Sequence, residues 1–210
     1  EKKKEEVTTF LEKGIEVICF VSIPLAVGVS AISNNLVPWF YGSGFEKVEL
    51  LLIILAPLMF LLGFNDLIGV QLLVAINKEK SLLIVNLFGM LINIAMNSIL
   101  IPQYFCYGAA FATVFSELVK TVCFCVISGR YFDFVHLIKS IGRYLTAALS
   151  MGVIVVALSK TIFVGASVFN TMIMILVGGC IYGCILMLMK DPWCLYGIKM
   201  VTGRLKHIKK

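Results

Sequence analysis

Six polar or ionisable side chains stand in the middle of long apolar runs, where a membrane would surround them. Carboxylates, an amine and amides at that depth can bind ions or a polar headgroup, and they are costly unless they face a polar cavity or a partner. Binding and translocation therefore explain such a set better than covalent catalysis. The six candidate pathway residues are Asp66, Asn86, Asn93, Asn97, Glu117 and Lys120.

Three of these residues form a polar stripe. Asn86, Asn93 and Asn97 are spaced by seven and then four residues, so at about 100° per residue they fall within about 40° of one another on a helix. The stripe could line a cavity. It could equally pin two helices together, because asparagine side chains form hydrogen bonds between membrane helices worth about 0.6 kcal/mol each.

The next apolar run carries Thr113, Glu117 and Lys120 on one face by the same arithmetic. Glu117 and Lys120 are three residues apart and can neutralise each other. A buried ion pair seldom adds stability, so its place in the middle of a span favours a functional role as much as a structural one.

Asp66 lies about ten residues before the turn at Asn77 to Lys80, which places its carboxylate roughly 15 Å deep at 1.5 Å per residue. A carboxylate at that depth requires a proton or a cation partner. It could form a coupling-ion or proton site, or it could be a protonated residue that stabilises packing beside a helix break at Pro57 or Gly63.

The composition indicates an integral membrane protein. Hydrophobic residues make up 60% of the 210 residues and charged residues only 14%, and the mean hydropathy is +0.99. An ordinary soluble domain is about 45–50% apolar.

We expect an all-α, polytopic bundle over residues 15–190, preceded by a cytoplasmic lead-in at 1–14 and followed by a basic tail at 191–210. Runs of about 20 apolar residues predict six transmembrane helices, at 15–40, 48–76, 82–101, 108–127, 144–164 and 168–189.

The positive charges fix the expected orientation. If the N-terminus is cytoplasmic, every Lys and Arg except Lys120, in the fourth span, falls on one side or the other, and only Lys47 and Lys160 fall on the outer side. We therefore expect a multi-pass protein of the cell membrane with both termini cytoplasmic. The net charge of +6 then indicates contact with membrane lipids and their anionic headgroups, and no nucleic acid partner.

Recognisable catalytic motifs are missing from the sequence. It has no phosphate-binding Gly-x-x-x-x-Gly-Lys-Ser/Thr loop, no His-Glu-x-x-His and no Cys or His cluster with metal-ligand spacing. We expect no enzyme, no bound metal and no cofactor other than a coupling H⁺ or Na⁺. The seven cysteines lie mostly in apolar runs, and we expect free, packed thiols.

The turn between the third and fourth runs carries a resemblance to a known family. Pro102-x-Tyr104 leads to Gly108-Ala109-Ala110-Phe111-Ala112-Thr113 and then Ser116-Glu117. This segment resembles the Pro-x-Tyr-Gly-x-x-Gly-Ala-Ala-x-Ala-Thr and Ser-Glu pattern of polysaccharide transporters, the flippases of O-antigen and capsule synthesis in the multidrug/oligosaccharidyl-lipid/polysaccharide (MOP) superfamily. The turns Phe40-Tyr41-Gly42 and Lys78-Glu79-Lys80 also match. The chain departs from the pattern at Phe105 and Asn77, where the family often has glycine.

The resemblance implies one half, the C-terminal one, of a MOP-type flippase with 12 to 14 spans, whose missing N-terminal half would be a partner. It implies transport of undecaprenyl-diphosphate-linked oligosaccharide repeat units by alternating access, with the polysaccharide polymerase machinery as a further partner. Lys120 would then attract the anionic headgroup and the asparagine amides would bind sugar hydroxyls. Asp66 or Glu117 would take up H⁺ or Na⁺.

Two other functions remain open from the sequence. A MATE-like, cation-coupled multidrug exporter of the same superfamily would need an acidic cavity, and Lys120 would repel its cationic substrates. A membrane enzyme of polymer synthesis would need acids or histidines grouped at one interface, whereas those of this chain are scattered.

Overall fold

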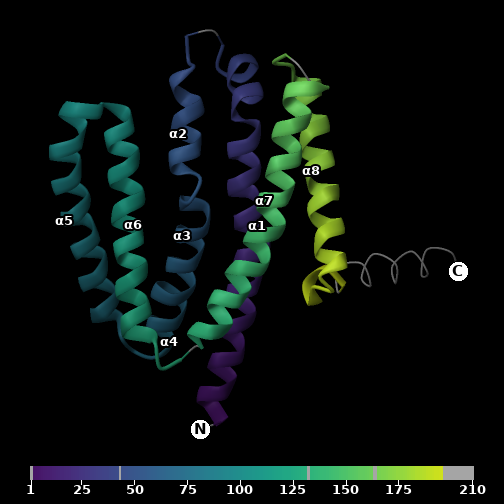
Figure 1. The fold of residues 1–210 in the computed structure, drawn as a ribbon. Helices are drawn as coiled ribbons and strands as arrows, with labels where there is room; N and C mark the ends of the chain where they lie inside the picture. The colour runs from purple at the N-terminus through teal and green to yellow at the C-terminus, as the bar shows by residue number, and fades with distance from the viewer. Residues whose placement is uncertain (1, 43, 132, 163–164, 196–210) are drawn as a thin grey trace, which may run out of the picture.

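The computed structural model describes residues 2–42, 44–131, 133–162 and 165–195, and it is helical as expected (Figure 1). Six helical segments are long and apolar enough to cross a membrane. The second crossing is divided into several pieces. The elements are α1 (Lys2–Phe40), α2 (Lys47–Leu55), α3 (Leu58–Asn65), the π-helix η1 (Asp66–Leu72), α4 (Leu73–Ala75), α5 (Glu79–Tyr104), α6 (Cys106–Ser128), α7 (Phe134–Thr161) and α8 (Val168–Leu188).

The crossings alternate in direction through the bundle. The carboxyl ends of α1, α5 and α7 lie at one end, and those of α4, α6 and α8 lie at the other (Figure 1). The hydrophobic core runs along α1 and joins it to η1, α7 and α8 through residues such as Ile15, Ile68, Tyr144 and Leu186. In contrast, α5 packs on α6 and buries only Val85 and Gly89. The α5–α6 hairpin therefore forms one side of the bundle.

Most of the segment between the fourth and fifth predicted spans is helical. The helix α7 begins at Phe134, whereas the apolar run predicts a start at residue 144. Asp133 caps the helix by accepting a hydrogen bond from the Val135 amide at 2.8 Å. Hydropathy did not predict this first part of the helix, because it contains polar residues such as His136 and Lys139. The predicted lead-in likewise continues without interruption into α1, which begins at Lys2.

Proline explains the break in the second crossing. The helix α2 ends at Leu55, and Pro57 stands immediately before α3 with a φ of −58°. Proline has no amide hydrogen and cannot continue the hydrogen-bond ladder of a preceding helix. Gly63, the other expected break point, remains helical and lies beside α1, where an added Cβ would be 3.3 Å from Ile18.

The α5–α6 hairpin turns at Phe105, within the predicted hinge. Phe105 has φ 50° and ψ −126°, and Asn77, in the turn before α5, has φ 56°. These are the two positions where the family pattern often has glycine, which adopts positive φ without steric cost. Just after the hinge, an added Cβ at Gly108 would lie 2.4 Å from the Leu100 carbonyl oxygen. Only glycine allows α5 and α6 to approach this closely.

Candidate functional site

A polar cluster joins the middle of α6 to the end of α3. The Glu117 side chain is 13% exposed, and its Oε1 lies 2.5 Å from the Lys120 ammonium nitrogen. Its Oε2 accepts a hydrogen bond of 2.9 Å from the Asn65 amide. The two predicted ionisable residues of α6 thus pair with each other, and a residue of α3 completes the cluster.

Asn65 and Thr121 are members of this cluster that sequence reasoning did not select. The Asn65 amide also reaches the Glu117 carbonyl oxygen at 3.2 Å, and the Thr121 hydroxyl lies 2.8 Å from Asn65 Oδ1. Asn65 is 7% exposed. Asn65 could have been selected from the sequence as a second polar residue beside Asp66 in an apolar run. The sequence could not show that it faces α6.

Gly89 makes room for Lys120 on the other side of α6. An added Cβ at Gly89 would lie 2.5 Å from Lys120 Cγ and 2.6 Å from Cδ. The aliphatic part of Lys120 therefore lies directly against the α5 backbone. This contact directs the ammonium group towards Glu117 in the space between α5, α6 and α3.

The asparagine stripe is partly an interface between α5 and α6. Asn93 donates a hydrogen bond to the Ser116 hydroxyl at 3.2 Å, and Asn97 donates to Asn93 Oδ1 at 2.9 Å. Asn97 Oδ1 is buried and has no partner among the described residues. Asn86 is exposed. The structure therefore brings Asn93 and Asn97 together and leaves Asn86 on the surface.

Asp66 occupies a different environment from Glu117. It begins η1, its side chain is exposed, and its Oδ2 accepts a hydrogen bond from Gln71 at 3.1 Å. An exposed carboxylate at membrane depth requires a polar partner or a cavity, because lipid cannot solvate it. Gln71, five residues further along η1, supplies that polar partner.

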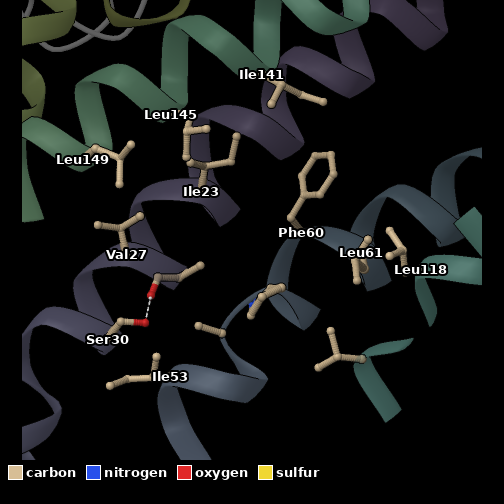
Figure 2. A pocket seen from close by; sticks show the side chains of 14 residues that line it. Ile23, Val27, Ser30, Ile53, Phe60, Leu61, Leu118, Ile141, Leu145 and Leu149 are labelled. Atoms are coloured by element: carbon tan, nitrogen blue, oxygen red, sulfur yellow. Dashed lines mark hydrogen bonds between the residues drawn. The ribbon is translucent and has the colours of Figure 1, made fainter. Parts of the chain in front are cut away.

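A large cavity lies between α1, α2, α3, α6 and α7, and hydrocarbon side chains line nearly all of it (Figure 2). Its volume is about 660 Å³. The Ser30 hydroxyl donates its hydrogen to the Ala26 carbonyl oxygen at 2.8 Å. None of the six predicted pathway residues lines this cavity. Its walls are Ile23, Ala26, Val27, Ser30, Ile53, Ala56, Pro57, Phe60, Leu61, Val114, Leu118, Ile141, Leu145 and Leu149.

A second polar cluster ties α7 to the segment after α8, and the sequence did not reveal it. Asp191 is fully buried, and its Oδ2 accepts hydrogen bonds from Arg143 at 3.0 Å and Tyr144 at 2.9 Å. Its Oδ1 accepts from the backbone amides of Trp193 and Cys194. The Asp191 carboxylate therefore anchors the segment after α8 to α7.

At the same end of the bundle, His136 of α7 lies close to α1, with its Nε2 3.4 Å from Glu16 Oε1. Glu16 Oε2 also accepts a hydrogen bond of 2.8 Å from the Trp193 indole. This cluster closes one end of the α1–α7–α8 group. The basic tail beyond it, from residue 196 onwards, lies outside the described residues.

The geometry offers no site built for a tightly bound metal in the part of the chain that the structure describes, where no three His, Cys, Asp or Glu side chains come together. Six helices that are long and apolar enough to cross a membrane define the class of the molecule, a multi-pass membrane protein. The family model described as "Lipid II flippase MurJ" matches residues 1–178. The chain therefore belongs to this family, whose members are transporters and not enzymes.

A solved structure shows the same fold. The chain is similar to "Lipid II flippase MurJ, inward closed conformation", with a TM-score of 0.75 and 22% sequence identity. The match covers 90% of this chain and 41% of that one, so the chain spans less than half the length of its structural relative. No curated protein matches in the sequence comparison. The expected fold of a lipid-linked precursor flippase is confirmed, whereas the O-antigen and capsule branch is not shown.

Proposed function

We propose that this chain takes part in moving a polyprenyl-diphosphate-linked saccharide across the cell membrane by alternating access. The observation that carries the proposal is the family match over residues 1–178. The polar cluster around Glu117 in the middle of α6 supports it, because transport pathways are where ionisable groups at membrane depth are found.

The family match and the resemblance of the hairpin indicate two substrates of the same chemical class. The family takes its description from lipid II, whereas the hairpin from Pro102 to Glu117 resembles the O-antigen and capsule transporters. Both kinds of substrate are lipid-linked precursors. We therefore propose a substrate with a hydrocarbon tail, an anionic diphosphate and a saccharide, and we favour lipid II over an O-antigen repeat unit because the family match covers far more of the chain.

Each part of such a substrate has a chemical counterpart in the bundle. The apolar cavity of Figure 2 suits a hydrocarbon chain, and Lys120 is a cation at membrane depth that suits a diphosphate. The ammonium group is held by Glu117 in this structure, so headgroup binding requires Lys120 to exchange partners. The exposed Asn86 amide and the Asn93–Asn97 pair are the proposed contacts to sugar hydroxyls.

We further propose that both termini are cytoplasmic in the cell membrane. The helix ends support this orientation, because Lys78, Lys80 and Arg130 lie at the same end of the bundle as the start of α1, and Lys47 and Lys160 lie at the opposite end. Positive charge concentrates on cytoplasmic loops. Asp66 and Glu117 are the proposed sites for a coupling H⁺ or Na⁺.

The test is the leaflet distribution of lipid-linked saccharides in cells that lack the gene for this protein. We expect accumulation on the cytoplasmic face, rescued by the wild-type gene and poorly by Lys120→Ala. Lys160→Ala is the matched control, since it removes the same charge near the end of α7, and it should rescue fully. An unchanged lipid pool together with new sensitivity to cationic drugs would instead establish the exporter function.

A further inference from the structure

A positive charge stands at each end of the apolar part of α7. No charged residue lies between Arg143 and Lys160. These two positions are about 26 Å apart at 1.5 Å per residue, close to the hydrocarbon thickness of about 30 Å of a bilayer. The helix begins at Phe134, so its first turns extend beyond Arg143 to the level of the lipid headgroups. Lys139, one turn before Arg143, lies there and is exposed.

Arg143 and Lys139 share a face of α7 that is directed away from the apolar cavity. Residues four apart on a helix are neighbours on its surface. The α7 residues that line the cavity of Figure 2 are Ile141, Leu145 and Leu149. At about 100° per residue they lie about 120–160° around the helix from Arg143. The two cations therefore belong to a surface that is separate from the cavity.

A buried carboxylate holds Arg143 in place. The Arg143 Nη1 donates a hydrogen bond of 3.0 Å to Asp191 Oδ2, and the guanidinium carbon lies 5.9 Å from the centre of the Tyr144 ring. Asp191 is 0% exposed, and it also accepts hydrogen bonds from the Tyr144 hydroxyl and from the amides of Trp193 and Cys194. Its negative charge is therefore shared among four donors, and Arg143 keeps much of its positive charge for another ligand.

The exposed side of this guanidinium suits a phosphate. A guanidinium has five N–H donors in one plane, and two of them can bind two oxygens of the same phosphate. Among the described residues, only Nη1 of Arg143 has a hydrogen-bond partner, and the side chain is 32% exposed. Lys139 forms no ion pair in the described part of the chain, and it adds a second positive charge one turn away.

The nearest other carboxylate is already bonded. Glu16 on α1 accepts a hydrogen bond of 2.8 Å from the Trp193 indole, and its other oxygen lies 3.4 Å from His136. Lys190, which directly precedes Asp191, is exposed and adds positive charge to the same end of the bundle. This end therefore favours an anion.

We propose that Arg143 and Lys139 form a binding site for the phosphate of an anionic phospholipid in the leaflet that surrounds the start of α7. A lipid headgroup fits better than free phosphate, because the site borders the apolar part of the helix. On the same face, the Thr146 and Ser150 hydroxyls donate to helix carbonyls, and Val153 is 70% exposed. These residues can lie against acyl chains. The site does not depend on the proposed transport of a lipid-linked saccharide.

The experiment is native mass spectrometry of the full-length gene product in neutral detergent, with phosphatidylglycerol or zwitterionic phosphatidylcholine added at equal concentrations. The wild type should retain phosphatidylglycerol in preference. Binding should weaken about fivefold in Lys139→Ala and about 25-fold in Lys139→Glu, in proportion to the charge removed. Lys160→Ala removes the same charge from the other end of α7 and is the matched control, which should bind as the wild type does.

The role of the planar donors is tested separately. Arg143→Lys keeps the positive charge but loses the fork that binds two oxygens, so it should also bind phosphatidylglycerol more weakly than the wild type. Thermal unfolding without lipid controls for misfolding. The two Lys139 variants should unfold as the wild type does, because this side chain is exposed and forms no ion pair among the described residues.

Photo-crosslinking locates the bound lipid. Phosphatidylglycerol with a photoreactive group beside its phosphate should label residues 134–146 in the wild type and in Lys160→Ala, and much less in Lys139→Glu. Equal retention of the two lipids by the wild type, or labelling that Lys139→Glu leaves intact, would overturn the inference. Labelling that an excess of inorganic phosphate abolishes would assign the site to free phosphate and would also overturn it.

Discussion

The hydroxyl of Tyr182 on α8 donates a hydrogen bond of 3.0 Å to the carbonyl oxygen of Phe20 on α1. This is the carbonyl that Pro24, four residues later and without an amide hydrogen, leaves without its helical partner. The two rings also pack together, with centroids 6.1 Å apart. A side chain from the last crossing thus satisfies the acceptor that the proline frees in the first, at a depth where water cannot.

Replacing Tyr182 with phenylalanine should therefore destabilise the bundle by about 1–2 kcal/mol, because it keeps the ring but leaves the Phe20 carbonyl buried without a partner. Thermal unfolding in detergent measures the change. The exposed Tyr104→Phe is the control and should have no effect. In a Pro24→Ala background the helix regains its own amide donor, so Tyr182→Phe should cost much less there; an equal cost in both backgrounds would contradict the explanation.

Gly89→Ala should disturb the Glu117–Lys120 pair without changing either residue. The new methyl group would collide with the Lys120 stem, and we expect a loss of about 1–3 kcal/mol from overpacking together with reduced rescue in the leaflet assay. Gly179→Ala is the matched control, since an added Cβ there meets nothing within 4 Å; it should be neutral or slightly stabilising because alanine favours helices.

The clash is isolated by comparing Gly89→Ala in two backgrounds, because Lys120→Ala deletes the colliding atoms but also removes the partner of Glu117. Relative to Lys120→Ala alone, the added Gly89→Ala should cost little stability. An equal cost of Gly89→Ala in the wild-type and Lys120→Ala backgrounds would show that the glycine serves some other contact.

The six crossings were predictable because an apolar run is a local property of the sequence, and the structure confirms the all-α, six-helix fold. The hinge at Phe105 was predictable for the same reason, since Pro102 and Gly108 bracket it. The start of α7 was not, because charged residues extend the helix beyond its apolar part and Asp133 rather than hydropathy determines where it begins.

Helical periodicity could not predict which partners the polar side chains contact. Spacing predicted that Asn86, Asn93 and Asn97 share a face, but only the packing of α5 on α6 separates the exposed Asn86 from the bonded pair. Asn65 and Asp191 acquire their partners from elements that are 52 and 48 residues away in the chain. No local pattern contains that information, which is why neither residue was selected.

Replacing Phe105 with glycine should stabilise the hairpin. Phe105 has φ 50° and ψ −126°, a conformation that costs a side-chain-bearing residue about 1–3 kcal/mol and glycine very little. Because 74% of its side chain is exposed, little packing is lost, and we expect a gain of about 1 kcal/mol in thermal unfolding. The control Tyr104→Gly alters the last helical residue of α5 and should destabilise instead. Equal effects of both variants would show that the backbone angle is not the cause.

Removing the Asp191 carboxylate should detach the segment after α8 from α7. Asp191 is fully buried and binds Arg143, Tyr144 and two backbone amides, and breaking a buried pair by deleting one partner costs about 3–5 kcal/mol. Water can reach the guanidinium of Arg143, because 32% of its side chain is exposed. We therefore expect Asp191→Ala to cost only about 2–3 kcal/mol, which is close to the cost of leaving buried hydrogen-bond donors unpaired. Arg143→Met should cost less than Asp191→Ala, since Tyr144 and the two amides still bind the carboxylate. Limited proteolysis after Leu188 reports the detachment directly, and a greater sensitivity of Arg143→Met than of Asp191→Ala would contradict the central place of the carboxylate.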